Sequence, residues 1–432
     1  MNKQFSILAG KIVQKIARIK GGGSALPGLF IEKTNPRFAQ ETLAKIPHGV
    51  VVISGTNGKT TTTKMVVELL ESQGLRVFTN KTGSNFVRGV AAALLEAVDF
   101  QGNLAADIAV LELDEAHATH FVKIIQPRYT LLLNVMRDQL DRFGEIDYTA
   151  KLLQQVGEST SGVVLLNGSD SLLGAKDFTK NFQARVVRFG FNPKLAEFFP
   201  NDEELHASKK TKKVSKANSK SQKFEYRLED FSKNSAQIQS QNLENFKLQI
   251  SGIHNILNLT AAFGLVNEIF ANENLKFKKR ALREAIGQIQ PAFGRGETLN
   301  FNGDKIEIML VKNPAGFRSN LKSAELQGAQ VMLAINDNYA DGRDMSWLWD
   351  VDFSALADAQ VAMISGVRAY DMALRLFHDD IDFDEQKIEL NLRRATREFL
   401  AEKGDKKIFA TYTAMLEIRK EISKITDVEK IL

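Results

Sequence analysis

The sequence contains no cysteine among its 432 residues. Disulfide bonds and metal sites built on thiolates are therefore excluded. The chain suits a reducing compartment such as the cytosol, where disulfides are rare. Its six histidines are scattered, which argues against a zinc site made from protein side chains alone. Hard cations held by carboxylates and phosphates remain compatible with this composition.

The sequence also lacks a long uninterrupted hydrophobic run, so we expect no signal peptide and no membrane-spanning helix. The stretch FSILAGKIVQKIARI (5–19) is too short to span a bilayer and contains Lys11, Lys15 and Arg18. Its apolar residues recur at helical spacing. Two interpretations of this predicted helix stay open: it packs on the rest of the protein, or it lies on a membrane surface.

The excess of basic residues is small. A net charge of +5 and a pI near 9.0 favour anionic partners such as nucleotides. One lysine-rich stretch, HASKKTKKVSKANSKSQK (206–223), could account for the excess, so we predict no nucleic-acid partner. It lies in a polar segment (201–240) that we expect to be an exposed, mobile insertion. A polyanion-binding arm is the alternative to a solvated run of charge.

Strand-like and helix-like segments alternate from residue 48 onward. The predicted strands of the first half are GVVVISGT (49–56), RVFTN (76–80), ADIAVLELDE (106–115), YTLLLNV (129–135), GVVLLNGSD (162–170) and VVRFGF (186–191). Helix-like stretches separate several of these strands. This alternation predicts an α/β fold with a mostly parallel sheet covered by helices.

The length of the chain predicts more than one domain. Residues 1–47 are expected to form an N-terminal helix and a glycine-rich turn, GGGSALPG (21–28). Residues 48–298 are expected to form the main α/β domain, which includes the polar insertion 201–240. A hairpin-like stretch then opens a second, smaller α/β domain at 299–432, in which three apolar strands are separated by helical stretches.

The stretch VVVISGTNGKTTTT (50–63) places a glycine turn between an apolar strand and a predicted helix. Backbone N–H groups in such a turn point at phosphate oxygens, and the helix N-terminus adds positive partial charge. Lys59 can reach the β- and γ-phosphates, and the Thr60 hydroxyl can bind magnesium. The predicted nucleotide-binding residues here are Gly55, Thr56, Asn57, Gly58, Lys59, Thr60 and Thr61.

This loop is shorter than the usual phosphate-loop pattern. Ile53 stands where the first glycine of that pattern is expected. A glycine turn with a coincidental lysine is therefore the alternative to a nucleotide site.

Acidic residues follow the strand at 106–115. Glu112, Asp114 or Glu115 could bind a metal or a bridging water, because ligands of α/β sheets sit at the carboxyl ends of the strands. A solvated acidic loop is the alternative. The stretch KTGSN (81–85) follows another strand and offers hydroxyls and amides at the same edge. Thr60 and Ser84 could join one of these three carboxylates in a magnesium site.

Two further pairs of polar residues lie at predicted helices. Asn255 and Asn258 lie near a helix start, where their amides suit the edge of adenine, although helix capping explains them equally well. Asp138 and Asp141 share one helical face, which by itself is more typical of a surface than of a site.

Taken together, these motifs resemble the Mur ligase family. The matching stretches are, in order, GTNGKTTT, TGSN, LELDE, NVMRDQLD, GIHNILNLTAA, FGRGE and VKNPAG, between residues 50 and 316. The resemblance implies a central ATPase domain (48–298) followed by a smaller Rossmann-like domain (299–432). It also implies a reaction that joins a carboxylate to an amine through an acyl phosphate made from ATP.

Several departures make the chain most similar to the MurT group of that family, the ligase subunits of a two-subunit enzyme that amidates lipid II. The large N-terminal domain of most members is replaced by residues 1–47. Gln139 and Lys312 stand where the family usually has histidines. The stretch NDNYADGRDMSWLWDVDF (336–353) is not the usual amino-acid-binding pattern, and the segment 201–240 stands in place of a four-cysteine zinc ribbon, so no zinc site is expected.

The resemblance implies that ATP and Mg²⁺ phosphorylate the α-carboxylate of D-glutamate in the lipid II stem peptide, and that ammonia then gives D-isoglutamine. It assigns charge stabilisation to Lys59 and to Mg²⁺ on Thr60, Ser84 and Glu112. It assigns nucleotide binding to Asn255, Asn258 and Arg295, and contact with phosphate or the substrate carboxylate to Lys312.

The resemblance also implies a partner. This chain has no thiolate for a cysteine-dependent glutaminase, so ammonia would come from a GatD-type glutamine amidotransferase subunit in a heterodimer. An aspartate of this chain would complete that partner's catalytic Cys and His; we expect Asp350, with Asp344 as second candidate. Trp347 and Trp349 suit an interface, although an ordinary loop with two packed tryptophans is the alternative. A cytoplasmic protein would meet lipid II at the inner membrane face.

Two other functions stay open. The first is a single-chain Mur-type or folylpolyglutamate-type ligase that adds an amino acid. The second is a phosphate-loop switch or motor, in which nucleotide drives binding rather than ligation.

Overall fold

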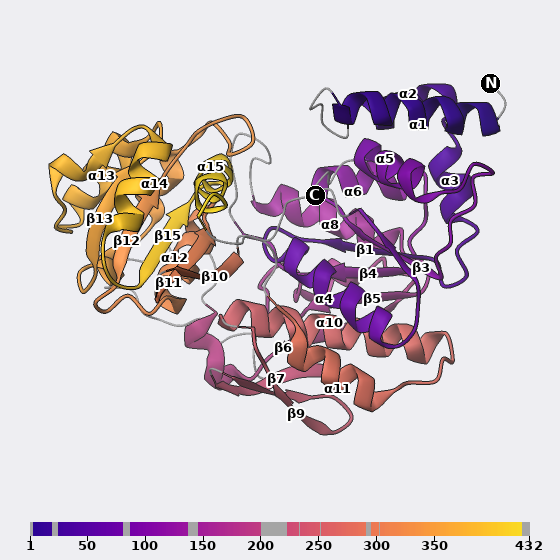
Figure 1. Cartoon of the computed structure of the whole chain (residues 1–432). Coiled ribbons are helices and arrows are strands. Elements are labelled where there is room, and N and C mark those ends of the chain that lie inside the picture. The colour runs from indigo at the N-terminus through magenta and orange to yellow at the C-terminus, as the bar shows by residue number, and fades with distance from the viewer. Residues whose placement is uncertain are drawn as a thin grey trace.

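The computed structural model describes residues 3–19, 25–80, 87–136, 146–199, 223–232, 234–250, 252–290, 295–301 and 303–425. Two α/β units follow one another along the chain (Figure 1). The first is built on a 9-stranded sheet and the second on a 6-stranded sheet.

The first sheet has the order β2-β3-β1-β4-β5-β6-β7-β8-β9. Its strands are β1 (Val50–Ser54), β2 (Val77–Thr79), β3 (Ile108–Glu112), β4 (Tyr129–Leu132), β5 (Val163–Asn167), β6 (Arg185–Phe191), β7 (Tyr226–Ser232), β8 (Ser235–Gln239) and β9 (Leu243–Lys247). Pairing is parallel from β2 to β7 and antiparallel from β7 to β9. The prediction of a mostly parallel sheet is confirmed.

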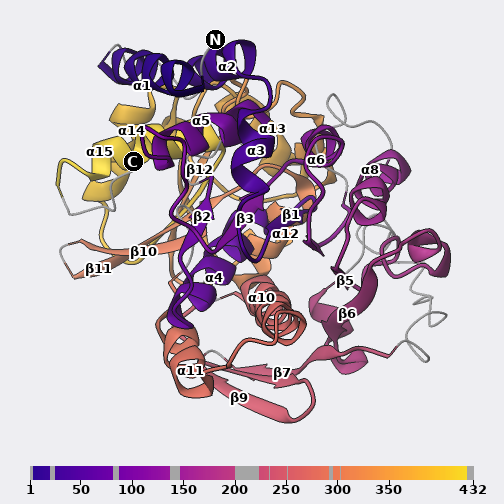
Figure 2. The ribbon, with the colours of Figure 1, turned by 90° about the vertical axis from the view of Figure 1, so that its right-hand side faces the viewer.

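Helices cover both faces of this sheet (Figure 2). The helices are α1 (Lys3–Ile19), α2 (Ala25–Thr34), α3 (Phe38–Leu43), α4 (Lys59–Ser72), α5 (Val87–Ala97), α6 (Glu115–Val122), α8 (Ile146–Glu158), α10 (Ile253–Asn272) and α11 (Lys279–Gln288), with 3₁₀ turns η1 (Lys176–Thr179) and η2 (Pro193–Phe198). Strand residues alternate between faces. Val51 and Ile53 of β1 therefore pack with α4, α10 and α11, whereas Val50 and Val52 pack with α3, α5 and α6.

The N-terminal region differs from the prediction. The stretch 21–28 was expected to be a glycine-rich turn, but its last four residues begin helix α2. Pro27 is tolerated there because a proline in the first turn of a helix costs no hydrogen bond. Gly28 lets α2 lie close to α5, since a Cβ at this position would be 2.0 Å from the carbonyl oxygen of Arg88. Among its described residues, the N-terminal region thus contributes three helices rather than one.

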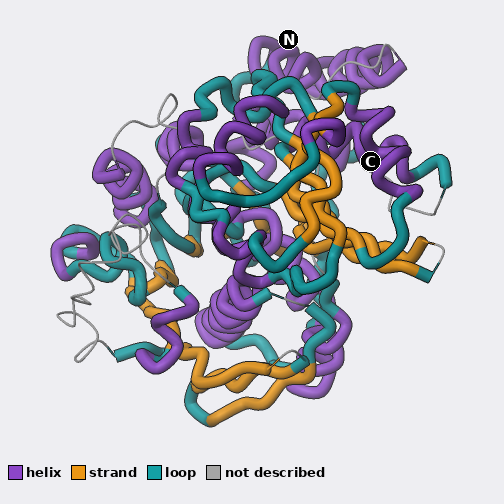
Figure 3. The backbone as a smooth tube through the Cα atoms, turned by 90° about the vertical axis from the view of Figure 1, so that its left-hand side faces the viewer, coloured by secondary structure: helices purple, strands orange, loops and turns teal. Residues whose placement is uncertain are grey.

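The polar segment 201–240 was expected to be an exposed insertion, and this is wrong for its last part. Strands β7 and β8 lie within it, and with β9 they extend the sheet as an antiparallel meander (Figure 3). Tyr226, Leu228, Ala236 and Ile238 are buried at alternate positions, which gives these short strands one packed face. Residues 200–222, with most of the lysines, lie outside the described residues.

The second sheet has the order β10-β11-β15-β12-β13-β14. Its strands are β10 (Arg295–Phe301), β11 (Asp304–Leu310), β12 (Gln330–Ala334), β13 (Gln360–Ser365), β14 (Ile388–Glu389) and β15 (Lys406–Ala410). Its helices are α12 (Pro314–Ser323), α13 (Ala369–His378), α14 (Leu392–Ala401) and α15 (Tyr412–Ile422), with 3₁₀ turns η3 (Ser346–Asp350), η4 (Ser354–Leu356) and η5 (Glu385–Lys387).

The second unit begins with the expected hairpin. Strands β10 and β11 pair antiparallel, and the remaining strand pairs are parallel. The first strand of the second sheet starts at Arg295, a few residues before the expected boundary at 299. α12 and α13 share one hydrophobic core with η3, whereas α14 and α15 share the core on the opposite face of the sheet.

None of the helices in the described part of the chain is both long enough and apolar enough to cross a membrane.

Candidate functional site

The glycine turn between β1 and α4 has the backbone that a phosphate cradle needs. Gly55 and Gly58 have φ values of +135° and +86°, which L-residues with side chains rarely adopt. A Cβ at Gly55 would lie 3.0 Å from the backbone of Asn134, and one at Gly58 would lie 2.8 Å from the Asn258 side chain. The two glycines are therefore required by both conformation and space, and α4 starts directly behind them.

Lys59 is folded back over this turn. Its ammonium donates hydrogen bonds to the carbonyl oxygens of Gly55 (2.5 Å) and Thr56 (3.3 Å) and lies 3.5 Å from the Glu115 carboxylate. Only 8% of Lys59 is exposed, so its charge acts in a weakly screened environment. Burial raises the pKa of the Glu115 carboxyl, an effect that the Lys59 ammonium opposes.

The predicted magnesium residues Thr60 and Glu112 are brought together. The Thr60 hydroxyl donates to Glu112 Oε1 at 2.9 Å across the carboxyl ends of β1 and β3. Asn80, at the end of β2, fixes the Glu112 backbone through two hydrogen bonds, of 2.8 Å to its carbonyl oxygen and 3.0 Å from its N–H. Nearby, Oδ1 of Asp114 is buried without a hydrogen-bond partner.

These oxygens fit a hard cation. A hydroxyl, a carboxylate and an unsatisfied buried carboxylate oxygen are the donor types that Mg²⁺ prefers, and water and phosphate would supply the remaining ligands. Within the described residues, no group of three or more His, Asp or Glu side chains could hold a metal by itself. The arrangement therefore suits a metal that arrives with a nucleotide.

Asn134, which follows β4, holds the turn from the other side. Its side chain accepts a hydrogen bond from the Asn57 N–H (2.8 Å) and donates one to the Asn57 carbonyl oxygen (3.0 Å). The Thr56 side chain is hydrogen-bonded to the backbone of Met136 in the same segment. The loop is thus clamped in place without a ligand, which limits the reorganisation that binding would require.

The second unit reaches the phosphate turn directly. Lys312 donates to the Thr56 carbonyl oxygen at 3.2 Å, and the Asn313 amide donates to Asn57 Oδ1 at 3.1 Å. Asn313 also caps α12 by accepting a hydrogen bond from the Gly316 N–H at 2.8 Å. These contacts place the positive N-terminal end of α12 at the domain boundary.

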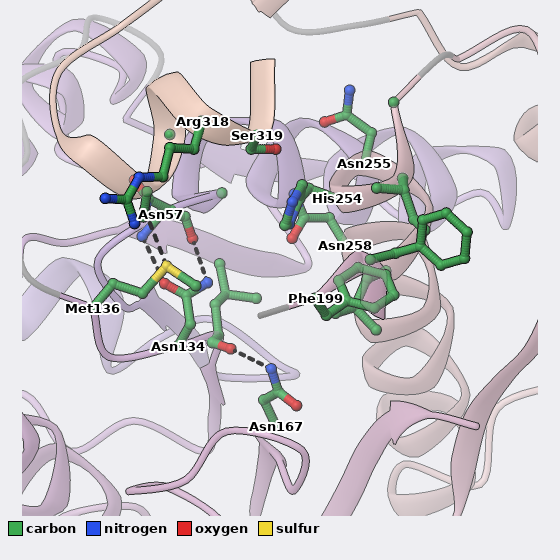
Figure 4. Close-up of a pocket in the computed structure, with 18 of the residues that line it drawn as sticks. Asn57, Asn134, Met136, Asn167, Phe199, His254, Asn255, Asn258, Arg318 and Ser319 are labelled. Atoms are coloured by element: carbon green, nitrogen blue, oxygen red, sulfur yellow. Dashed lines mark hydrogen bonds between the residues drawn. The ribbon is translucent and has the colours of Figure 1, made fainter. Parts of the chain in front are cut away.

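A cavity of about 550 Å³ lies between the two units (Figure 4). On one side it is lined by Asn57, Gly58, Thr61 and the residues that follow β4 and β5. On the other side Lys312, Arg318 and Lys322 give it a basic wall. In Figure 4 the Arg318 side chain extends from α12 toward Asn57. Such a volume and charge suit a nucleotide.

The start of α10 forms the third wall of this cavity, where Asn255 and Asn258 lie beside His254. The His254 ring packs edge-on against Phe199 at 5.4 Å between ring centroids. Burial, followed by the positive charge of Lys322, lowers the pKa of His254 to about 4. The imidazole is therefore neutral near pH 7. Aromatic and amide groups here offer a slot for a flat heterocycle.

The region proposed to serve a partner lies apart from the cavity. Asp350 ends η3 and makes no hydrogen bond or ion pair with the part of the chain that the structure describes. Asp344 instead accepts a hydrogen bond from the Ser346 N–H at 2.9 Å, and this bonding lowers the pKa of its carboxyl.

The two tryptophans of this region differ in exposure: Trp349 is 50% exposed, whereas Trp347 is buried against Phe317. The expectation that both suit an interface is wrong for Trp347.

Some predicted residues cannot be placed. Ser84, Asp138, Gln139 and Asp141 lie outside the described residues. The backbone of Arg295 begins β10, but its side chain is outside what the structure describes.

Sequence reasoning missed Asn80, Asn134 and Asn313 as positioning residues. Asn80 and Asn134 follow apolar strands, and Asn313 precedes a proline at a helix start. A polar amide directly after a buried strand is the signal that could have identified the first two.

Comparison with known proteins agrees with this geometry. Residues 53–266 match the family model "Mur ligase middle domain", and residues 310–415 match "MurT ligase C-terminal". The chain is 30% identical to a Streptococcus pneumoniae protein named lipid II isoglutaminyl synthase (glutamine-hydrolyzing) subunit MurT, over 99% of this chain and 98% of that one. It is 26% identical to the protein of that name from Staphylococcus aureus strain COL, over 98% of both chains.

Solved structures show the same fold. MurF from Acinetobacter baumannii superposes with a TM-score of 0.66 at 17% identity, covering 93% of this chain and 81% of that one. MurF from Thermotoga maritima, solved in complex with ADP, gives a TM-score of 0.64 at 17% identity, covering 91% of this chain and 84% of that one.

Proposed function

The chain belongs to the Mur ligase family, and we propose that it is the ligase subunit of a glutamine-hydrolysing lipid II isoglutaminyl synthase. The observation that carries this proposal is similarity along the whole chain to two subunits of that name, together with a phosphate cradle that faces a basic wall across the domain boundary. The reaction would convert the α-carboxylate of D-glutamate in the lipid II stem peptide to the amide of D-isoglutamine.

We propose that ATP occupies the cavity, with its phosphates on the turn Gly55–Lys59 and its base at the start of α10. Asn255 and Asn258 are the candidates to bind the adenine edge. A Mg²⁺ ion on Thr60 and Glu112 would neutralise charge on the phosphates. This assignment is supported by the donor types around Glu112, including the buried Oδ1 of Asp114 that lacks a partner.

Lys59 and Lys312 are proposed to act on the reacting groups. Both ammonium groups now donate to carbonyl oxygens of the turn, at a position where phosphate oxygens would replace those acceptors. Lys59 would stabilise the charge that moves during phosphoryl transfer to the substrate carboxylate. Lys312 comes from the second unit. The site would therefore be complete only when the two units are in contact. Ammonia would then attack the acyl phosphate and release phosphate.

The ammonia is proposed to come from a GatD-type glutaminase subunit. Asp350 has no partner within the described residues, so its carboxylate is available to orient a histidine of another chain. Trp349 beside it and Leu374 on the adjacent helix α13 are half exposed, and Tyr370 of the same helix is 64% exposed. Arg375 of α13 ties the two elements together by donating to the carbonyl oxygen of Val351 (2.8 Å). This apolar surface is supported as a partner face by its aromatic content.

The test replaces Asp350 by asparagine in the complex with the glutaminase subunit. Glutamine-dependent amidation of lipid II should fall by about 10²–10⁴, whereas amidation with free ammonium should persist, because loss of an orienting aspartate disables only the histidine that it positions. Asp344→Asn is the matched control and should keep both activities. Equal loss of both activities in Asp350→Asn would overturn the assignment of Asp350.

A further inference from the structure

Helix α1 exposes its largest apolar side chains to solvent. The exposed fractions are 59% for Phe5, 46% for Leu8, 52% for Ile12 and 49% for Ile16. Successive residues of an α-helix are rotated by about 100°, so these four side chains fall within one arc of about 80°. They form a continuous apolar face along the helix, which we call the outer face of α1.

The opposite side of α1 carries the contacts with the protein and is built from smaller residues. Ser6, Gly10 and Ala17 are buried there, and Ile7 is the one large apolar residue among the fully buried side chains of this helix that the structure describes. A Cβ at Gly10 would lie 2.9 Å from a methyl of Leu95 in α5. An ordinary surface helix turns its bulky apolar residues inward. In α1 most of the bulky apolar residues point outward instead. This supports a second contact, made by the outer face, in addition to the contact with the rest of the protein.

Two lysines border one edge of the outer face. By the same rotation, Lys15 and then Lys11 follow Leu8 around the helix, and the Lys11 ammonium also donates to the Glu96 carbonyl oxygen of α5 at 3.3 Å. The helix KQFSILAGKIVQKIARI contains no acidic residue. A helix with an apolar face, a basic edge and low mean hydropathy is the type that lies in the interface of an anionic bilayer.

We propose that the outer face of α1 docks this protein on the anionic lipid surface of the membrane. Figures 1 and 2 show α1 and α2 as the outermost layer of the first unit, stacked over α5. α5 begins at Val87, shortly after β2 and the site residue Asn80. The choice of a lipid surface also rests on the proposed function, because the substrate of that function is itself held in the membrane by its lipid.

A second copy of the chain fits this face less well. A symmetric dimer would bring the same lysine-flanked surface of each protomer together, with no acidic residue in α1 to compensate. An anionic bilayer satisfies both the apolar face and its basic border. The contact should therefore weaken, but not vanish, when salt screens the charges.

The test measures co-sedimentation of the full chain, in complex with its glutaminase subunit, with vesicles of phosphatidylglycerol and phosphatidylethanolamine. The variant carries Phe5→Gln, Ile12→Gln and Ile16→Gln, all at exposed positions. Its partition coefficient should fall by about tenfold or more. The control Leu243→Gln changes a residue of β9 that is 48% exposed and should bind vesicles like the unaltered protein. Vesicles of phosphatidylcholine alone should bind the unaltered protein more weakly.

Two results would overturn the proposal. One is equal partition of the triple variant and the unaltered protein. The other is a dimer in sedimentation velocity that the triple variant converts to monomer.

Activity separates this proposal from the proposed function. The triple variant should amidate lipid II in vesicles more slowly but a water-soluble stem peptide at the unaltered rate, and equal rates on both substrates would contradict docking. If the unaltered complex amidates neither substrate, the proposed function is wrong. The docking proposal is then still tested by comparing how the triple variant and the unaltered protein bind vesicles.

Discussion

At the scale of single residues, the site depends on polar groups that are held in place before any ligand arrives. Lys59 is buried, and its ammonium donates hydrogen bonds to two carbonyl oxygens of the turn. The same turn is proposed to bind the phosphates. Asn80 and Asn134 fix the backbone of Glu112 and Asn57 through paired hydrogen bonds. Groups held in this way stabilise developing charge without reorganising during the reaction.

Replacing Lys59 by alanine tests this account. The variant should lose amidation with either glutamine or ammonium by about 10³ or more, because charge on the moving phosphoryl group is no longer neutralised. ADP release in the presence of lipid II is the measurement. Lys64→Ala on the same helix, which breaks a partly exposed pair with Glu68 at 3.8 Å, should leave the rate nearly unchanged. Substrate-dependent ADP formation that survives in Lys59→Ala would refute the role of the turn.

The sequence suggested the residues that belong to a recognisable chemical motif. It missed the residues whose role is to hold other residues in place. A lysine and a threonine behind a glycine turn indicate phosphate binding by themselves, so Lys59 and Thr60 could be proposed as phosphate-binding residues from the sequence. Asn80 and Asn134 are common residues whose importance comes from partners 32 and 77 positions away. A local pattern can mark an amide that follows a strand, but it does not show which distant backbone that amide will hold.

At the scale of elements, close packing of α2 on α5 anchors the N-terminal helices. Gly28 is buried at the crossing, where the backbone of α2 approaches the Arg88 carbonyl oxygen. Any side chain there would push the two helices apart. Because α1 packs on α2 and α5, its position depends on this crossing.

We expect Gly28→Ala to destabilise the protein by about 1–3 kcal/mol, the usual cost of overpacking. The matched control is Gly287→Ala in α11, where a Cβ would lie 3.7 Å from the nearest atom, the Lys247 carbonyl oxygen. That variant should be neutral or more stable by up to about 1 kcal/mol, because alanine favours the helix over glycine. Thermal unfolding of both variants is the measurement. A Gly28→Ala protein as stable as the Gly287→Ala control would contradict the close crossing.

Strands with a clear pattern of apolar residues were predicted from the sequence, whereas strands with a weak pattern were not. The apolar runs VVVI of β1 and IAVL of β3 identify buried strands. Strand β8, SAQIQ, buries only Ala236 and Ile238, and polar residues around it hide the alternation. Its stability comes from pairing with β7 and β9, a tertiary effect that overrides local composition.

At the scale of the whole molecule, the candidate site lies between two units. The first unit supplies the phosphate turn and the second supplies Lys312 and the basic helix α12. His254 of the first unit lies near Lys322 of the second, and its pKa is lowered to about 4. Protonation of this imidazole would place two positive charges at the boundary.

This arrangement predicts a loss of stability in acid. Between pH 6.5 and about 4 the unfolded chain binds a proton at His254 that the folded chain does not, so stability falls as the pH drops through this window. His254→Gln should reduce that fall, which thermal unfolding at pH 7 and pH 4.5 would measure. A pH dependence identical in the unaltered and His254→Gln proteins would show that the imidazole does not titrate as stated.

The division of labour between two chains is the central claim, and the nitrogen source tests it most directly. The purified chain, with and without its glutaminase subunit, is given lipid II and ATP with ammonium, isotopically labelled glutamine or free amino acids, and the product is identified by mass spectrometry. Ammonium should support amidation by the chain alone, and glutamine should support it only with the partner. Ligation of an amino acid by the chain alone, with no amide formed from ammonium, would contradict the account and favour a single-chain ligase.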